Sequence, residues 1–147
     1  MSEPLVKKAY ETEKEAASSY TDGLGRLRGQ GLRYTGVEKV VARIAVDTII
    51  HKHLMKAILD AQKEIEKLGG EGPVEEVKEI ELSTEQKLLV KRFAEMHLDI
   101  EKDMIETYQK MAENMTHPLF KGLAEALVKN EQEHHRLLAE LIAKYKE

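Results

Sequence analysis

The sequence predicts an all-α fold, an up-down bundle of four helices, and three observations lead to this prediction. Proline occurs only at positions 4, 73 and 118, and glycine clusters in residues 23–36 and 69–72, so the long stretches between them are largely free of helix breakers. Within those stretches apolar residues recur at spacings of three and four, the period of an amphipathic helix. The connections between the stretches differ in length, which determines how successive helices can pack.

The first two helices are predicted on either side of the first glycine cluster. One runs from about residue 4 to about residue 27. The next opens with Thr35-x-x-Glu38, the pattern of a capping box. It continues to Leu68, where Gly69 supplies the C-terminal stop.

The other two helices are predicted in the second half of the chain. The third opens with a second capping box, Ser83-x-x-Gln86, and runs to about residue 115. The fourth starts at His117–Pro118, because proline suits the first turn of a helix, and runs almost to residue 147.

Two connections indicate the topology. Only a few residues join the third and fourth helices, so these should be antiparallel neighbours. The connection between the second and third helices has roughly 13 residues and can extend about 40 Å, which is about the length of the helices themselves. It predicts a long crossover within a single domain spanning residues 1–147.

Composition restricts the function. The 147 residues are 41% hydrophobic and carry a net charge of −4, with acidic and basic residues mixed along the chain. No basic block indicates nucleic acid or a membrane surface as a partner, and no apolar run approaches the roughly 20 residues of a membrane span. The absence of cysteine excludes disulfides, thiolate metal sites and thiol catalysis. Because the N-terminus lacks the apolar core of a signal peptide, a cytoplasmic protein is expected.

The two halves of the chain resemble each other. Glu13 and Glu101 are each followed seven positions later by a tyrosine. His51 opens the segment HKHLMKAIL, and His134 opens the similar segment HHRLLAELI. The chain is therefore interpreted as two copies of one helical hairpin.

Ionisable residues lie on the apolar faces of these predicted helices. At about 100° per residue, Glu131 and His134 fall within the apolar stripe of the fourth helix. Glu13 and His51 fall within the stripes of the first and second helices, and Glu101 lies at the edge of the third. Because an unpaired buried carboxylate is costly, the group needs a shared partner. A divalent ion such as iron, manganese or zinc suits glutamates and histidines from facing helices.

Each of these residues has a simpler explanation when it is taken alone. An isolated Glu-x-x-His is common and means little, and His51 or His97 can be a hydrogen-bonded core histidine. The recurrence of the same residue types at matching places in both halves favours the metal-site hypothesis.

With these motifs, the chain resembles the ferritin-like superfamily of di-iron carboxylate proteins, and within it the rubrerythrin-like group. That family has a glutamate on the first helix and Glu-x-x-His on the second, and then both again on the third and fourth. The resemblance covers nearly the whole chain and implies a ferritin-like bundle with iron as its cofactor. It implies a terminal carboxylate at Glu101, a bridging glutamate at Glu131 and an imidazole ligand at His134, the three residues expected to carry the chemistry. In the first half it implies Glu13 and His51 as further ligands.

One position departs from the family pattern. The bridging glutamate of the second helix would fall on residue 48, which is threonine and a poor ligand for a divalent ion. Asp47 and His97 are candidates to replace it. The alternatives are an asymmetric metal pair bridged by Glu131 alone, a single metal in the second half, or a site that has lost metal.

The resemblance implies oxygen or peroxide chemistry, with a small oxidant as substrate. True rubrerythrins carry a rubredoxin domain, which needs cysteines, so electrons would come from a separate donor protein. The alternative is a non-enzymatic bundle, with a structural or lost metal site, that binds a partner. Val46, Ile49 and Ile50 support it, because they lie away from the metal-facing stripe and predict a second buried face. The crossover residues or a second subunit, as in a homodimer, would cover that face.

Overall fold

The chain folds into four long α-helices. The computed structural model describes residues 3–69 and 81–145, and within these ranges it contains no strand. No helix among the described residues is both long enough and apolar enough to span a membrane. Because the described residues form four helices and no strand, the predicted all-α class is confirmed. The helices are α1 (Glu3–Gly29), α2 (Gly36–Lys67), α3 (Thr84–Asn114) and α4 (Pro118–Lys144).

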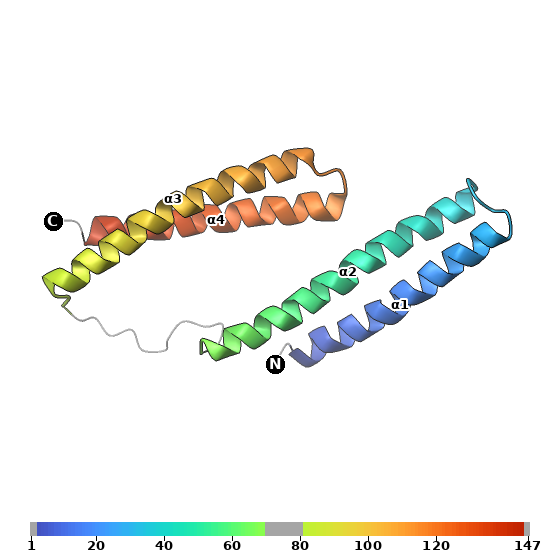
Figure 1. The fold of residues 1–147 in the computed structure, drawn as a ribbon, viewed down its shortest axis with the longest axis horizontal. Helices are drawn as coiled ribbons and strands as arrows, with labels where there is room; N and C mark the ends of the chain where they lie inside the picture. Colours follow the sequence, from blue (N-terminus) through green and yellow to red (C-terminus); the bar gives the residue numbers. More distant parts are fainter. Residues whose placement is uncertain (1–2, 70–80, 146–147) are drawn as a thin grey trace. The chain divides into compact units, whose positions relative to one another are not determined.

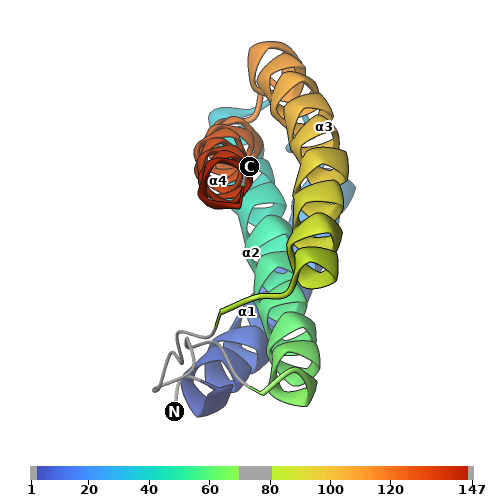
Figure 2. The ribbon, with the colours of Figure 1, turned by 90° about the vertical axis from the view of Figure 1, so that its left-hand side faces the viewer.

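The helices form two hairpins. The chain divides into two compact units, residues 1–76 and 77–147. Helices α1 and α2 lie side by side and antiparallel in the first unit, as α3 and α4 do in the second (Figures 1 and 2). The predicted pairing of the third and fourth helices is confirmed. The predicted crossover falls largely on residues 70–80, which lie outside the described residues, and the single domain spanning residues 1–147 stays a prediction.

The start of α2 differs in one detail from the predicted capping box. The Thr35 side chain accepts a hydrogen bond from the Glu38 backbone N–H at 3.2 Å, as expected. The Glu38 carboxylate, however, accepts from the N–H of Tyr34, at 2.5 Å. The cause is that the Thr35 N–H already donates to the carbonyl of Leu32. At the other end, Gly69 has φ +107, a left-handed conformation that glycine adopts without strain.

The second hairpin begins each of its helices as predicted. The Ser83 hydroxyl accepts from the Gln86 backbone N–H at 3.1 Å, and the Gln86 side chain accepts from the Ser83 N–H at 2.9 Å, which completes the capping box. Pro118 is the first residue of α4, and the Nδ1 atom of His117 caps it by accepting from the Leu119 N–H at 3.1 Å. The helix starts therefore follow from local side-chain chemistry.

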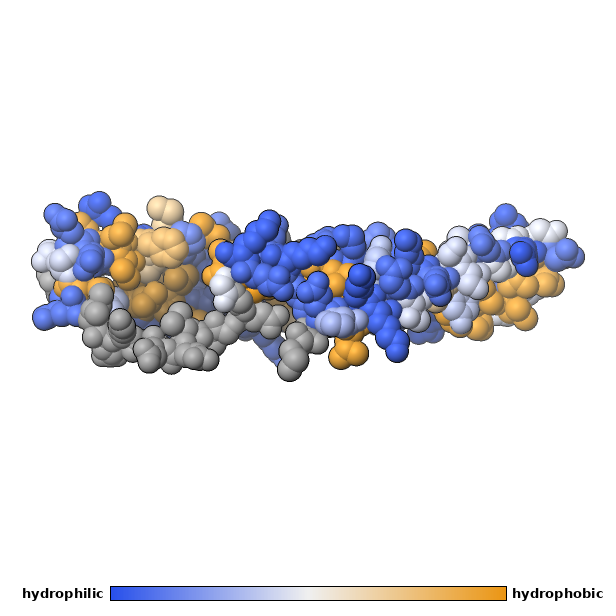
Figure 3. Space-filling view, turned by 90° about the horizontal axis from the view of Figure 1, so that it is seen from below, coloured by the Kyte–Doolittle hydropathy of each residue, from blue (hydrophilic) through white to orange (hydrophobic). Residues whose placement is uncertain are grey.

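The buried positions within the hairpins are mostly small. Alanines are buried on all four helices, and no large side chain is fully buried among the described residues. Larger apolar residues on the stripes that carry the predicted ligands remain exposed, and Figure 3 shows hydrophobic side chains (orange) at the surface. Each hairpin thus has apolar surface that would gain stability from a partner. The exposed stripe residues are Val37, Val40, Ile44, Phe120, Leu123 and Leu141.

We expect Ser83→Ala to destabilise the second hairpin. The substitution removes the hydroxyl that accepts the Gln86 N–H, and loss of such a cap costs about 0.5–2 kcal/mol. Denaturant unfolding followed by circular dichroism measures the change. Thr107→Ala, at an exposed position inside the same helix, is the control and should cause no loss. Equal stability of the Ser83→Ala and parent chains would contradict the role of the cap.

Candidate metal centre

The second hairpin brings three predicted ligands together. Glu101 lies on α3, and Glu131 and His134 lie three residues apart on one face of α4. The Nδ1 atom of His134 is 3.5 Å from Glu131 Oε2 and 3.7 Å from Glu101 Oε2. One ligand atom from each residue lies within 4.8 Å of the other two. The three residues expected from the motif therefore form one cluster.

One carboxylate oxygen of each glutamate in this cluster lacks a hydrogen bond. Oε2 of Glu101 and Oε2 of Glu131 are buried and have no hydrogen-bond partner among the described residues. Glu131 as a whole is only 7% exposed. An unsatisfied buried acceptor costs about 1–3 kcal/mol, and more when it is charged. A cation at this place would remove that cost.

The arrangement of the cluster fits a divalent transition metal. Separations of 3.5 and 3.7 Å are those of atoms that share one ion at about 2.0–2.2 Å from each. Two carboxylates and one imidazole are ligands that iron, manganese and zinc accept. Two carboxylates together carry the charge that a divalent ion balances.

A carboxylate on the outer side of α4 is satisfied in a different way. Glu133 receives a hydrogen bond of 2.9 Å from Arg136 Nε, and this bond lowers the pKa of the Glu133 carboxyl. Arg136 also pairs with Glu140. Glu131, only two residues from Glu133, faces an imidazole in place of a guanidinium. The inner carboxylates are therefore arranged for a cation other than an arginine.

The first hairpin repeats the glutamate–histidine pair. Glu13 on α1 faces His51 on α2, with Oε2 and Nδ1 3.6 Å apart. The corresponding atoms of Glu101 and His134 are 3.7 Å apart in the second hairpin. The similarity inferred between the two halves of the sequence is thus matched by the same helix-to-helix geometry.

In the first hairpin, the position that matches Glu131 is occupied by Thr48, whose hydroxyl is not available to bind a metal. Thr48 is 6% exposed, nearly the same as the 7% of Glu131 at the matching position. Its hydroxyl donates a hydrogen bond of 2.6 Å to the carbonyl of Ile44, one turn earlier in α2. The side chain is therefore buried and engaged with its own helix. The sequence indicated a missing carboxylate here but not this bond.

The two candidates to replace the missing ligand do not join the three-residue cluster. His97 Nδ1 lies 2.9 Å from the Phe93 carbonyl, and the two rings stack with their centroids 4.0 Å apart. That nitrogen is therefore engaged by its own helix. Asp47 is half-buried on α2, and it already takes part in an interaction within the chain. A ligand role for either residue stays a prediction.

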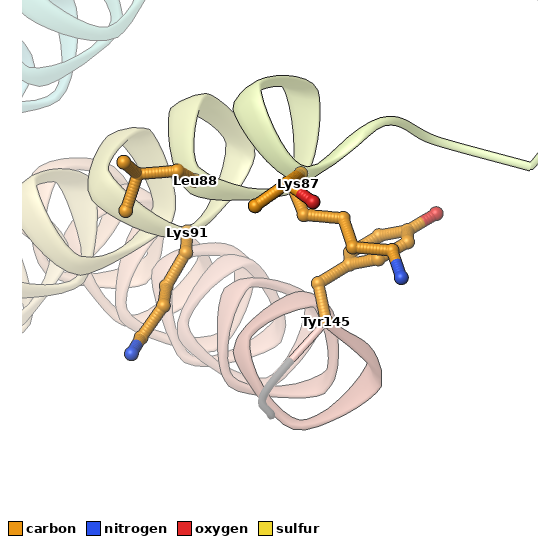
Figure 4. Close-up of a pocket in the computed structure, with 5 residues that line it drawn as sticks. Lys87, Leu88, Lys91 and Tyr145 are labelled. Atoms are coloured by element: carbon orange, nitrogen blue, oxygen red, sulfur yellow. The ribbon is translucent and has the colours of Figure 1, made fainter.

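A pocket in the second hairpin lies apart from the cluster. It is found where α3 begins and α4 ends, and Figure 4 shows the side chains around it. One of its lysines, Lys91, is 3.9 Å from Glu95 in an ion pair. None of the predicted ligands contributes to the pocket, so we do not assign the site to it. Its lining residues are Thr84, Lys87, Leu88, Lys91 and Tyr145.

Comparison with known proteins agrees with the motif. A family model described as Rubrerythrin matches residues 5–142, a range that includes α2, α3, nearly all of α1 and α4, and every predicted ligand. A search of curated proteins gave no match, and neither did a search of solved structures.

We expect Glu131→Leu to stabilise the metal-free chain. The substitution replaces a buried carboxylate that has an unsatisfied oxygen by an apolar side chain, which should raise the free energy of unfolding by about 1–3 kcal/mol. Thermal unfolding in the presence of a chelator measures this change. Gln132→Leu, at the exposed neighbouring position, is the control and should change the free energy by less than about 0.5 kcal/mol. A clear loss of stability in Glu131→Leu would mean that the carboxylate already has a protein partner.

Proposed function

This chain belongs to the rubrerythrin family, and we propose that it binds iron at Glu101, Glu131 and His134 and reduces peroxide or oxygen there. The observation that carries the proposal is the pair of buried carboxylate oxygens, both facing one imidazole nitrogen, that lack hydrogen bonds. Family membership supports iron as the metal, although manganese and zinc suit the same ligands.

The residues of the cluster have separable roles in this proposal. Bound iron supplies reversible one-electron chemistry and open positions for a small oxidant. Glu131 holds the ion from inside the hairpin, since it is nearly fully buried. Glu101 binds from the facing helix. His134 has a side chain that is 42% exposed, and in this proposal a molecule as small as peroxide approaches the ion along the imidazole.

The electrons must come from outside the cluster. Reduction of one peroxide to two waters consumes two electrons and two protons. The chain has no cysteine to hold an iron–thiolate donor of the rubredoxin type. The proposal therefore includes a separate electron-donor protein as a partner. It also keeps the cytoplasmic location expected from the sequence.

A second candidate is a non-enzymatic bundle that binds metal structurally and binds a partner through its apolar surface. The exposed apolar residues Val46 and Ile49 on α2 favour it. In this candidate a second copy of the chain covers them as a homodimer. Ile50, expected on the same face, is already buried within the described structure.

Iron binding should be visible as a change in stability. Adding Fe²⁺ without oxygen should raise the melting temperature, because a ligand that binds only the folded chain stabilises it by about 2.7 kcal/mol at 100 times its dissociation constant. Glu131→Ala should abolish the shift, whereas Glu133→Ala, which alters a paired surface carboxylate, should retain it. An equal shift in both variants would exclude Glu131 as a ligand.

Peroxide reduction is tested on the iron-loaded chain. Because each Fe²⁺ supplies one electron, we expect the loss of one peroxide for every two Fe²⁺ oxidised, together with a near-ultraviolet charge-transfer band from the oxidised iron. Glu131→Ala with the same total iron should consume peroxide no faster than free Fe²⁺ does. A parent chain that binds iron but behaves like free Fe²⁺ would support the structural role instead.

A further inference from the structure

We infer that the chain binds one metal ion tightly, with all of its protein ligands in the second hairpin, and does not form the two-metal centre that the family pattern implies. This inference rests on the proposed metal binding, but not on the proposed reaction. The observation behind it is the difference between Thr48 and Glu131 at matching positions in two otherwise similar hairpins.

The second hairpin has a sufficient ligand set of its own. Glu101, Glu131 and His134 are contributed by two helices joined by a short turn, and their ligand atoms lie within 4.8 Å of one another. Three protein ligands with further open positions are typical of catalytic metal sites. Binding at this cluster therefore needs no ligand from residues 1–76.

The first hairpin falls one ligand short. Glu13 and His51 face each other at 3.6 Å, but they offer one carboxylate and one imidazole. A second ion there would keep part of its charge unbalanced in a half-buried place. Two ligands also hold an ion far less firmly than three do.

Thr48 does not supply the missing ligand. Its hydroxyl is neutral and donates to the Ile44 carbonyl at 2.6 Å. To bind a metal it would have to give up that bond inside a buried region. The backbone position is nevertheless correct for a ligand, because the matching position in α4 places a carboxylate in the cluster.

Counting the ions bound by the 147-residue chain tests the inference. We propose titrating the metal-free protein with Co²⁺, which needs no oxidant and has visible absorption that reports its ligands. The parent chain should bind one ion tightly. Glu131→Ala should weaken that binding by more than about 100-fold, since even outer-shell changes cost 10–100-fold. Two tight ions in the parent chain would overturn the inference.

Variants of the first hairpin separate the two halves. Glu13→Gln and His51→Ala should each leave the affinity of the tight ion within about twofold of the parent value, as expected for independent sites. A tenfold or greater loss in either variant would mean that the first hairpin supplies a ligand. These measurements decide the matter even if changes at position 48 disturb folding.

Substitutions at position 48 test whether a second metal site can be created. Thr48→Glu should raise the count to two ions per chain, and Thr48→Val, which removes only the hydroxyl, should leave it at one. A folded Thr48→Glu chain that still binds one ion would show that residue 48 is not what limits the count.

The inference and the proposed reaction can fail separately. A chain that binds one Co²⁺ but whose iron form does not consume peroxide faster than free Fe²⁺ would retain the inference and lose the reaction. A chain that binds two ions tightly and consumes peroxide would retain the reaction and lose the inference.

Discussion

The inner face of the second hairpin is governed by the cost of burying carboxylates without a partner. Glu101 and Glu131 each direct an unsatisfied oxygen towards His134, and buried polar atoms without a hydrogen bond are few in folded proteins. The buried alanines, Ala94 and Ala124, allow α3 and α4 to lie close together, and capping side chains fix where each helix begins. The two helices thereby hold ligand atoms of two carboxylates and one imidazole within 4.8 Å of one another.

The fold was predictable because its signals are local. Proline, glycine and capping residues determine where helices begin and end, and the period of apolar residues determines which side faces inward. The box at Ser83 and the start at Pro118 appeared as expected. The exception at Thr35 arose because its N–H has a competitor, the Leu32 carbonyl in the preceding turn. The sequence pattern carries no signal for that competition.

The candidate site was predictable in part. The similarity between the halves singled out Glu101 and His134, which recur as Glu13 and His51, whereas Glu131 was identified by its place on the apolar stripe and by the Glu-x-x-His motif. The sequence also made His97 a candidate ligand or a hydrogen-bonded core histidine, but it could not reveal the bond to Phe93 or the ring stacking that engages the imidazole. The inward-facing threonine was likewise foreseeable, whereas the bond to Ile44 depends on a rotamer. The spacing of residues indicates which face of a helix each one occupies. The structure adds the atom to which each polar group is hydrogen-bonded.

The similarity of the two hairpins has a consequence for the effect of substitutions in this chain. Among the described residues, only the second hairpin holds the full set of two glutamates and one histidine, so a substitution in the first hairpin leaves that set intact. The neutral side chain of Thr48 adds no buried charge to the first hairpin, in which Glu13 and His51 lie 3.6 Å apart. A single substitution, Thr48→Glu, would give both hairpins the same three residue types.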